Sequence, residues 1–368
     1  MKRMGILVLL TLLLFNNLKA LNNSTEQHDS TMGRGDVHVV QKFNPTEFIF
    51  DHIGDSFEWH VLTINHHHYS IPLPVILYSK NSGLHVFLSS KFHNVNKSFN
   101  EFRLETEGQY KGKIVELNRR GEIDSVNPLP LNFSITKNVF SILLISFLLC
   151  WIFISIANKY KKNPHIAPSG IQNLFEPIIL FVKNEVAIPS IGERNHLRFM
   201  PFLLTVFFFI WFTNMLGLIP IFPGGANVTG NIAVTMALAL FTFVIVNING
   251  NKHYWKEIIN APGVPWFLKF PIPIMPVVEF TGIITKPFVL MVRLFANILA
   301  GHMVAIVFMS LIFIFGAMKF WLGYVAAPIS ILFSVFMSAL ELLVALIQAY
   351  VFTLLSAIYI GMAITEHH

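Results

Sequence analysis

Arg293 lies inside the apolar run 286–304, KPFVLMVRLFANILAGHMV. An arginine at the centre of a membrane-spanning helix costs about 2.5 to 3.5 kcal/mol, so such residues face a protein interior or water and mark ion pathways. The alternative is a structural ion pair, or a side chain that snorkels to the membrane surface. A long apolar stretch follows Arg293, and Lys286 already occupies the preceding end of the run. We therefore interpret Arg293 as a functional residue.

Other polar residues share a helix face with Arg293. Glu279, Lys286 and Arg293 are seven residues apart, a spacing that drifts by only about 20° per step on a straight helix. Asn297 lies one turn further along nearly the same face. His302 is half a turn away from Arg293, which predicts a different partner for it.

The final apolar block repeats this pattern. Ser334, Glu341 and Gln348 are seven residues apart, and Tyr359 falls within about 20° of Gln348 at 3.6 residues per turn. A buried glutamate is unfavourable unless it is paired or reached by water. We predict that His302 and Glu341 are partners across two antiparallel helices; a purely structural hydrogen-bonded pair is the alternative.

These residues together could carry ions across a membrane. His302 and Glu341 are predicted to be reached from one side and Glu279 from the other, with Arg293 between them. The arrangement is that of two half-channels separated by a positive barrier. It favours conduction of protons or other cations by a moving carrier.

The composition indicates an integral membrane protein. Of the 368 residues, 54% are hydrophobic and only 12% are charged, and the mean hydropathy is +0.60, too apolar for a soluble domain of this length. The net charge of +6 does not indicate nucleic-acid binding, because the basic residues are scattered beside apolar segments. A single cysteine, Cys150, allows no internal disulfide and no thiol metal site.

The predicted fold class is an all-α polytopic membrane protein with a β-rich N-terminal domain. A membrane domain at 137–368 is predicted to contain five spans, at about 139–157, 199–220, 231–249, 275–318 and 321–363. A perpendicular span needs only about 20 residues, so the last two are predicted to be long, tilted helices forming a hairpin, joined near Lys319 to Tyr324. Two helices with a tight turn are the alternative for the last block, but it has no Gly or Pro between Pro328 and Gly361.

Charge predicts the orientation of the spans. Positive residues gather on the cytoplasmic side, and here they cluster after the first span, before the second and after the third: Lys159, Lys161, Lys162, Arg194, Arg198, Lys252, Lys256 and Lys269. This places the N-terminus outside and the C-terminus in the cytoplasm. Residues 169–189 mix apolar and charged positions and are predicted to lie along the cytoplasmic interface.

Residues 1–20 have the pattern of a secretory signal peptide, with a basic start and a short apolar stretch. An uncleaved anchor is the alternative, because Leu18 replaces the usual small residue. Residues 21–136 form a predicted extracytoplasmic domain with strands in WHVLTI (59–64), VILY (75–78), LHVFLSS (84–90) and KIVEL (113–117). Its histidines are not expected to bind metal, since neighbouring side chains of HHH alternate between the faces of a strand.

Two segments resemble the a subunit of F-type ATP synthases: KPFVLMVRLFANILAGH (286–302) and LELLVALIQAYVFTLLSAIYI (340–360). The resemblance extends from about residue 139 to the C-terminus and implies a bacterial inner-membrane protein that contacts lipid, a ring of c subunits and b-type peripheral stalk subunits. It implies that Arg293 faces the membrane carboxylate of each passing c subunit, with Asn297 and Gln348 as polar neighbours.

The same resemblance implies that His302 and Glu341 belong to the outer half-channel and Glu279 to the inner one. Histidine precedes glutamate here as in mitochondrial versions, whereas some bacterial relatives exchange the two. Gly282 and Thr285 stand where serines often line the inner half-channel. No cofactor, metal or direct ATP binding is expected, since the chain has no Gly-rich phosphate loop.

Two other functions compete with this interpretation. A proton-coupled secondary transporter would carry paired broken helices and an internal repeat, and we find neither. A receptor or assembly factor would use the external domain for binding, with the membrane polar residues merely structural. Contact between the region of Arg293 and a small carboxylate-bearing helical protein would separate these functions.

Overall fold

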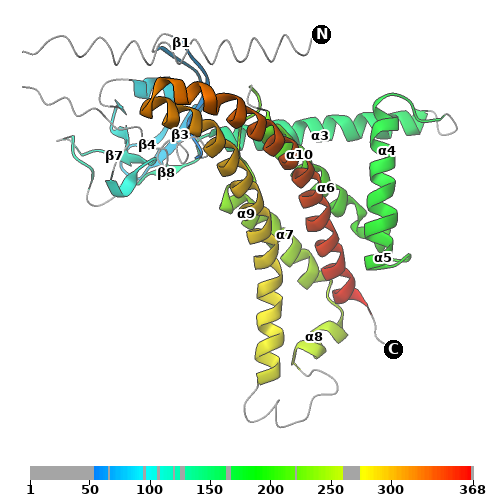
Figure 1. Cartoon of the computed structure of the whole chain (residues 1–368). Helices are drawn as coiled ribbons and strands as arrows, with labels where there is room; N and C mark the ends of the chain where they lie inside the picture. The colour runs from blue at the N-terminus through cyan, green and yellow to red at the C-terminus, as the bar shows by residue number, and fades with distance from the viewer. Residues whose placement is uncertain are drawn as a thin grey trace, which may run out of the picture. The chain divides into compact units, whose positions relative to one another are not determined.

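The structure is a computed structural model of the whole chain (Figure 1). It describes residues 54–64, 67–93, 97–105, 108–118, 121–124, 129–162, 167–219, 222–259 and 274–365. The predicted signal peptide lies outside them. The chain divides into two compact units, Met1–Asn44 with His60–Ser70, and Pro45–Trp59 with Ile71–His368. Among the described residues, the first unit contributes only to strands β1 (Glu58–Ile64) and β2 (His67–Pro72), which pair with each other.

Five helices in the described part of the chain are long and apolar enough to cross a membrane, which confirms the predicted number of spans. They are α3 (Lys137–Lys162), α6 (His196–Leu218), α7 (Ile232–Asn249), α9 (Ile274–Met318) and α10 (Phe320–Ile364).

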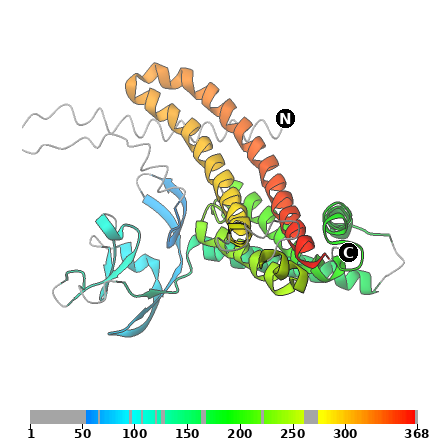
Figure 2. The ribbon, with the colours of Figure 1, turned by 90° about the horizontal axis from the view of Figure 1, so that it is seen from below.

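The two longest helices, α9 and α10, have 45 residues each, or about 68 Å at 1.5 Å per residue. They lie side by side in both views (Figures 1 and 2) and are joined by Lys319 alone. The connection is shorter than the predicted Lys319 to Tyr324, because residues 320–324 already belong to α10. Glycines allow the close approach beside this turn: a Cβ on Gly323 would lie 3.0 Å from the Cα of Gly316.

Shorter helices complete the membrane unit. The chain passes from α4 (Ile171–Phe181) through a π-helical segment, η3 (Val182–Ala187), into α5 (Ile188–Ile191), and α8 (Lys252–Ile259) precedes α9. In η3, Val182, Val186 and Ala187 are fully buried. Burial of these apolar side chains stabilises the packing of the charged segment against the helix core.

The core of the membrane unit is rich in aromatic side chains. Phe175 of α4 packs against Phe153 of α3 and Phe208 of α6, with ring centroids 6.1 and 5.5 Å apart. On α6, Leu203, Phe208 and Ile210 are fully buried. This packing makes α6 the best buried of the five spans, with 44% of its most apolar window inside the structure.

The β-containing region consists of short antiparallel strands. The larger sheet has the order β4-β3-β8, from β4 (Gly83–Leu88), β3 (Pro74–Ser79) and β8 (Leu131–Asn132), with Val75 opposite Phe87 and Tyr78 opposite Leu131. A second sheet has the order β5-β6-β7, from β5 (Ser98–Phe99), β6 (Phe102–Leu104) and β7 (Ile114–Glu116); two 3₁₀ turns are η1 (Ser89–His93) and η2 (Gly108–Tyr110).

Alternation of apolar residues explains these strands. On β3, Val75 and Leu77 are fully buried while Tyr78 is exposed, as expected when successive side chains point to opposite faces. Phe102 and Ile114 complete the same small core. Each of the four predicted strand segments overlaps a strand (β1, β3, β4 and β7), so the prediction of an N-terminal β-containing region is confirmed; the segment 84–90 runs past the end of β4 into η1.

Candidate functional site

Helices α9 and α10 meet through a series of side-chain contacts in reversed order along the chain. The ammonium of Lys286 lies 5.6 Å from the ring centroid of Tyr359, and Asn297 bonds to Gln348. Further along, Gly301 lies against Glu341, and Phe308 stacks on Phe333 at 5.3 Å. The pairing is antiparallel, and it brings the two polar stripes predicted from the sequence to one seam.

Arg293 lies on the side of α9 that faces away from the core. Its neighbours Leu290 and Leu294 are buried, at 1% and 0% exposure, whereas Arg293 and Asn297 are exposed. Within the described residues no carboxylate forms an ion pair with Arg293. Only 12% of the most apolar window of α9 and 17% of that of α10 are buried. The guanidinium therefore lies on an apolar surface that the chain itself leaves uncovered.

A hydrogen bond links the two helices one turn beyond Arg293. The Nδ2 of Asn297 donates to Oε1 of Gln348 at 2.8 Å. Gln348 is 2% exposed, and its Nε2 has no hydrogen-bond partner among the described residues. The oxygen of this amide is bonded within the described residues and its nitrogen is not, so the nitrogen provides a site for a water molecule.

Glu341 lies against the backbone of α9. A Cβ on Gly301 would come within 2.7 Å of Oε1 of Glu341, so glycine makes room for the carboxylate. That oxygen is buried and has no hydrogen-bond partner in the described part of the chain. Ser334, one step earlier in the α10 stripe, is 4% exposed and its hydroxyl is likewise unpartnered there.

His302 faces α6. Its Nε2 would lie 3.7 Å from a Cβ placed on Gly217. Because consecutive residues of a helix point about 100° apart, Gly301 fronts Glu341 while His302 turns toward α6. The two predicted partners thus lie beside the same turn of α9, and a direct bond between them stays a prediction.

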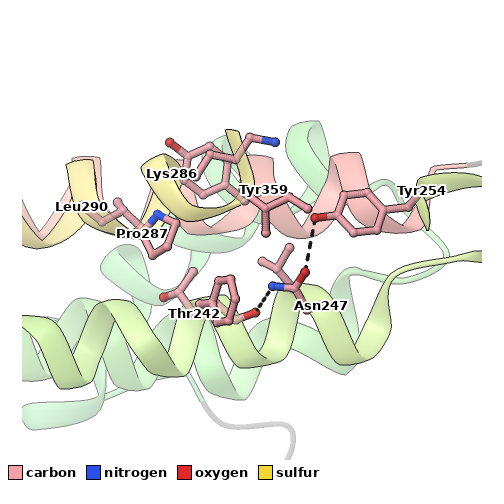
Figure 3. Close-up of a pocket in the computed structure, with 10 residues that line it drawn as sticks. Thr242, Asn247, Tyr254, Lys286, Pro287, Leu290 and Tyr359 are labelled. Carbon is pink, nitrogen blue, oxygen red and sulfur yellow. Dashed lines mark hydrogen bonds between the residues drawn. The ribbon is translucent and has the colours of Figure 1, made fainter. Parts of the chain in front are cut away.

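The other end of the seam contains a small cavity of about 10 Å³, near the size that holds one water (Figure 3). Lys286 and Tyr359 line it from α9 and α10, and Asn247 from α7. The Tyr254 hydroxyl of α8 donates to Oδ1 of Asn247 at 3.5 Å, and burial raises the pKa of Tyr254 above its ordinary value. Glu279, seven residues before Lys286, is half-buried and takes no part in these contacts.

A polar cluster that the sequence analysis missed lies where α6 ends and α7 begins. Thr229 donates a hydrogen bond to Oδ1 of Asn214 at 2.5 Å, and Asn227 is 8% exposed. The Nδ2 atoms of Asn214 and Asn227 are buried without a partner in the described residues. The signal was an asparagine, Asn214, near the end of the second apolar span.

The side chains gathered here suit the movement of protons. Carboxylate, imidazole, amide and hydroxyl groups accept or relay protons and hold water. Among the described residues, no three His, Cys, Asp or Glu side chains are close enough together to hold a metal ion.

Comparison with known proteins decides the family. The sequence profile of the family described as ATP synthase A chain matches residues 139–361, more than half of the chain. The chain belongs to the ATP synthase A chain family. The match includes every predicted site residue on α9 and α10.

Individual relatives of this A chain family agree over the same part. ATP synthase subunit a of Chloroherpeton thalassium is 43% identical over 244 residues, which are 64% of this chain and 68% of the relative. The subunit a of Myxococcus xanthus is 44% identical over 245 residues, 65% of this chain and 75% of the relative. ATP synthase subunit a 2 of Chlorobaculum tepidum is 45% identical over 242 residues, covering 64% of each chain.

The region before the first span matches something else. A separate profile, described as a domain of unknown function (DUF8433), matches residues 48–133. This interval contains all the strands described above, and the A chain profile begins just after it, at the first span. The protein is therefore an A chain family member with an additional N-terminal β-containing domain.

Proposed function

We propose that this chain is the proton-conducting stator subunit in the membrane sector of an F-type ATP synthase. Arg293 acts as the barrier between two half-channels and faces a ring of c subunits that carry the protons. The observation that carries the proposal is the position of Arg293. It is an exposed guanidinium on the uncovered apolar surface of α9, between a Glu341 and His302 end and a Lys286 and Glu279 end.

An exposed arginine on an apolar surface needs a counter-charge from outside the chain. At 4 Å and an effective dielectric constant of 20, opposite charges attract by about 4 kcal/mol. That attraction corresponds to about three pKa units on a carboxylate. It is large enough to discharge a protonated c-subunit carboxyl group as it reaches Arg293.

The identity of the cation matters for the barrier. The guanidinium stays protonated because its pKa is above about 12, whereas a buried lysine loses its proton readily. A barrier that lost its charge would let protons pass without rotation of the ring. The role therefore requires arginine and not just a positive charge.

The two ends of the seam then serve as entry and exit. Protons enter through His302 and Glu341 and load the carrier, and after rotation they leave past Glu279 on the cytoplasmic side. Asn297 and Gln348 hold the two helices together beside the exchange site. Each charge crossing about 100 mV releases about 2.3 kcal/mol, so several protons must pass for each ATP made.

The remaining parts of the chain position this seam. Helices longer than a perpendicular span lie tilted across the curved ring, while α3 and α4 leave apolar surfaces for lipid and for b-type peripheral stalk subunits. The basic residues around the spans support a cytoplasmic C-terminus and a β-containing domain outside the bacterial inner membrane. The catalytic sites for ATP lie on other subunits.

Cysteine cross-linking in the intact complex tests the proposal. Ala296→Cys and Ala300→Cys place thiols on the exposed side of α9 next to Arg293, in a Cys150→Ser background. We expect disulfide formation with cysteines introduced at the middle of the c-subunit helix. Leu143→Cys on α3, which is also exposed at 55%, is the matched control and should form none.

Cross-linking from α3 but not from α9 would contradict the proposal. A proton-coupled secondary transporter would form no disulfide with a c subunit from either α9 or α3, because it needs no ring of c subunits. The family assignment does not favour that alternative.

A further inference from the structure

Within the second compact unit, a buried tryptophan anchors the residues that open the N-terminal domain to the membrane helices. Trp59, at the start of β1, is 3% exposed. Its ring centroid lies 5.7 Å from that of Phe140 on α3 and 5.3 Å from that of Phe222, in edge-to-face geometry. Aromatic pairs of this geometry contribute stabilisation beyond that from the area they bury.

The anchor sits on the connection between α6 and α7. Trp59 forms one buried cluster with Ala226 and Val228. These two residues flank Asn227, and Thr229 follows directly. The same short segment, residues 222–230, therefore carries the apolar socket for the anchor and the polar cluster that contains Asn214.

Two backbone contacts fix the residues just before Trp59. The amide of Lys137 donates to the carbonyl of Ser56 at 2.9 Å, and the amide of Asn138 donates to Oδ1 of Asp55 at 3.1 Å. A carboxylate at the N-terminus of a helix satisfies a free amide and interacts favourably with the helix dipole. Asp55 and Ser56, just before Trp59, are thus held at the first turn of α3.

The polar side of this segment leads to His302. Gly217 lies between them: a Cβ placed on it would be 3.1 Å from the carbonyl oxygen of Ala226 and 3.7 Å from Nε2 of His302. The unpartnered Nδ2 atoms of Asn214 and Asn227 are nine-tenths buried or more. Buried amides without protein partners are ordinarily satisfied by water.

We infer that the N-terminal domain forms part of the proton entrance. Trp59 is a positioning residue that holds the segment 222–230 so that Asn214, Asn227 and Thr229 keep a water-filled path open to His302. The inference rests on the proposed function, since it assigns a wall to the outer half-channel.

Thiol accessibility tests the inference in membrane vesicles that contain the complete complex. Asn227→Cys in a Cys150→Ser background is labelled from outside with a membrane-impermeant methanethiosulfonate. We expect Trp59→Ala to lower the labelling rate by about tenfold, because the segment 222–230 then no longer holds the water-filled path past position 227 open. Trp59→Phe keeps an aromatic ring in the socket and should give an intermediate rate.

Passive proton conduction is measured in parallel, without the Asn227→Cys change and after the soluble ATPase sector has been removed. Conduction should fall by about tenfold with Trp59→Ala, because misplacing groups that take part in a transfer step can slow that step by this factor or more. Trp59→Phe should restore most of it. Val86→Ala, on the exposed face of β4, should change neither readout.

Co-purification of the c subunits reports assembly for each variant. If Trp59→Ala does not assemble, Trp59→Phe is compared with the unsubstituted chain instead. If Trp59 positions the segment 222–230, the smaller ring should still measurably change both the labelling rate and the proton conduction. Wild-type labelling and conduction in assembled Trp59 variants overturn the inference. The proposed function fails separately, if an Arg293 substitution leaves coupled transport intact.

Discussion

Asn297 of α9 donates a hydrogen bond to Gln348 of α10, with 2.8 Å between Nδ2 and Oε1. This bond joins the two polar stripes one helical turn from Arg293 and fixes the register of the long helices. A shift of either helix along its axis would leave the buried amide of Gln348 without a donor.

The first prediction concerns the strength of this link. Asn297→Ala leaves the acceptor oxygen of a 2% exposed glutamine unsatisfied, so stability should fall by about 1 to 3 kcal/mol. In the double variant with Gln348→Leu no unpaired buried amide remains, so it should lose less than the sum of the two single changes. Thermal unfolding of the purified complex measures all four combinations. Additive losses would show that the bond does not couple the helices.

The second prediction uses glycine as a spacer. Gly301→Ala places a methyl group 2.7 Å from Oε1 of Glu341, so the carboxylate must move and passive proton conduction should fall by about tenfold or more. Gly282→Ala is the matched control, because nothing lies within 4 Å of its new Cβ. Adding Glu341→Asp to Gly301→Ala should recover part of the conduction, since the shorter side chain leaves room for the methyl group. Equal effects of the two alanines would refute a steric role for Gly301.

The sequence predicted the two stripes because seven-residue spacing on a helix is a local property. It also predicted five spans, since an apolar run of about 20 residues or more is typical of a membrane-spanning helix. It could not predict which residue of α9 contacts Glu341, because that depends on how each of the two packed helices is rotated about its own axis. The structure shows that Gly301 does so while its neighbour His302 turns toward α6.

Long-range contacts were beyond the sequence for the same reason. Trp59 is separated from Phe140 and Phe222 by a whole domain, and nothing in its local pattern marks it as an anchor. The hydrogen bond between Thr229 and Asn214 joins a loop to the last turns of an apolar span. Polar residues of this kind are visible in a sequence, but their partners are not.

A third prediction tests the expected pair of His302 and Glu341. Glu341→Gln keeps the size of the side chain and removes its proton exchange, so conduction should fall by about 10²-fold, as for loss of a general acid or base. The exchanged variant His302→Glu with Glu341→His retains both groups and should recover part of it. Conduction no better in the exchanged variant than in Glu341→Gln would separate the roles of the two residues. Passive conduction through membranes stripped of the soluble sector is the measurement.

A fourth prediction concerns alkaline stability. Burial raises the pKa of Tyr254 above its ordinary value of 10.0, so the folded state holds the phenol proton more tightly than the unfolded state. The stabilisation is fully present below the ordinary value and is lost as the pH rises through the folded-state pKa. Tyr254→Phe should therefore weaken the loss of thermal stability as the pH rises above the ordinary tyrosine pKa of about 10. A profile for Tyr254→Phe that matches the profile of the unsubstituted chain would contradict the assignment.

The central claim is tested most directly by ATP-driven proton pumping in vesicles that contain the complex with Arg293→Lys. Arg198→Lys, at an exposed arginine of α6 outside the candidate site, is the matched control. If a permanently charged guanidinium separates the half-channels, pumping is lost in Arg293→Lys while the complex still assembles, and the control pumps normally. Coupled pumping that persists in Arg293→Lys would contradict the account.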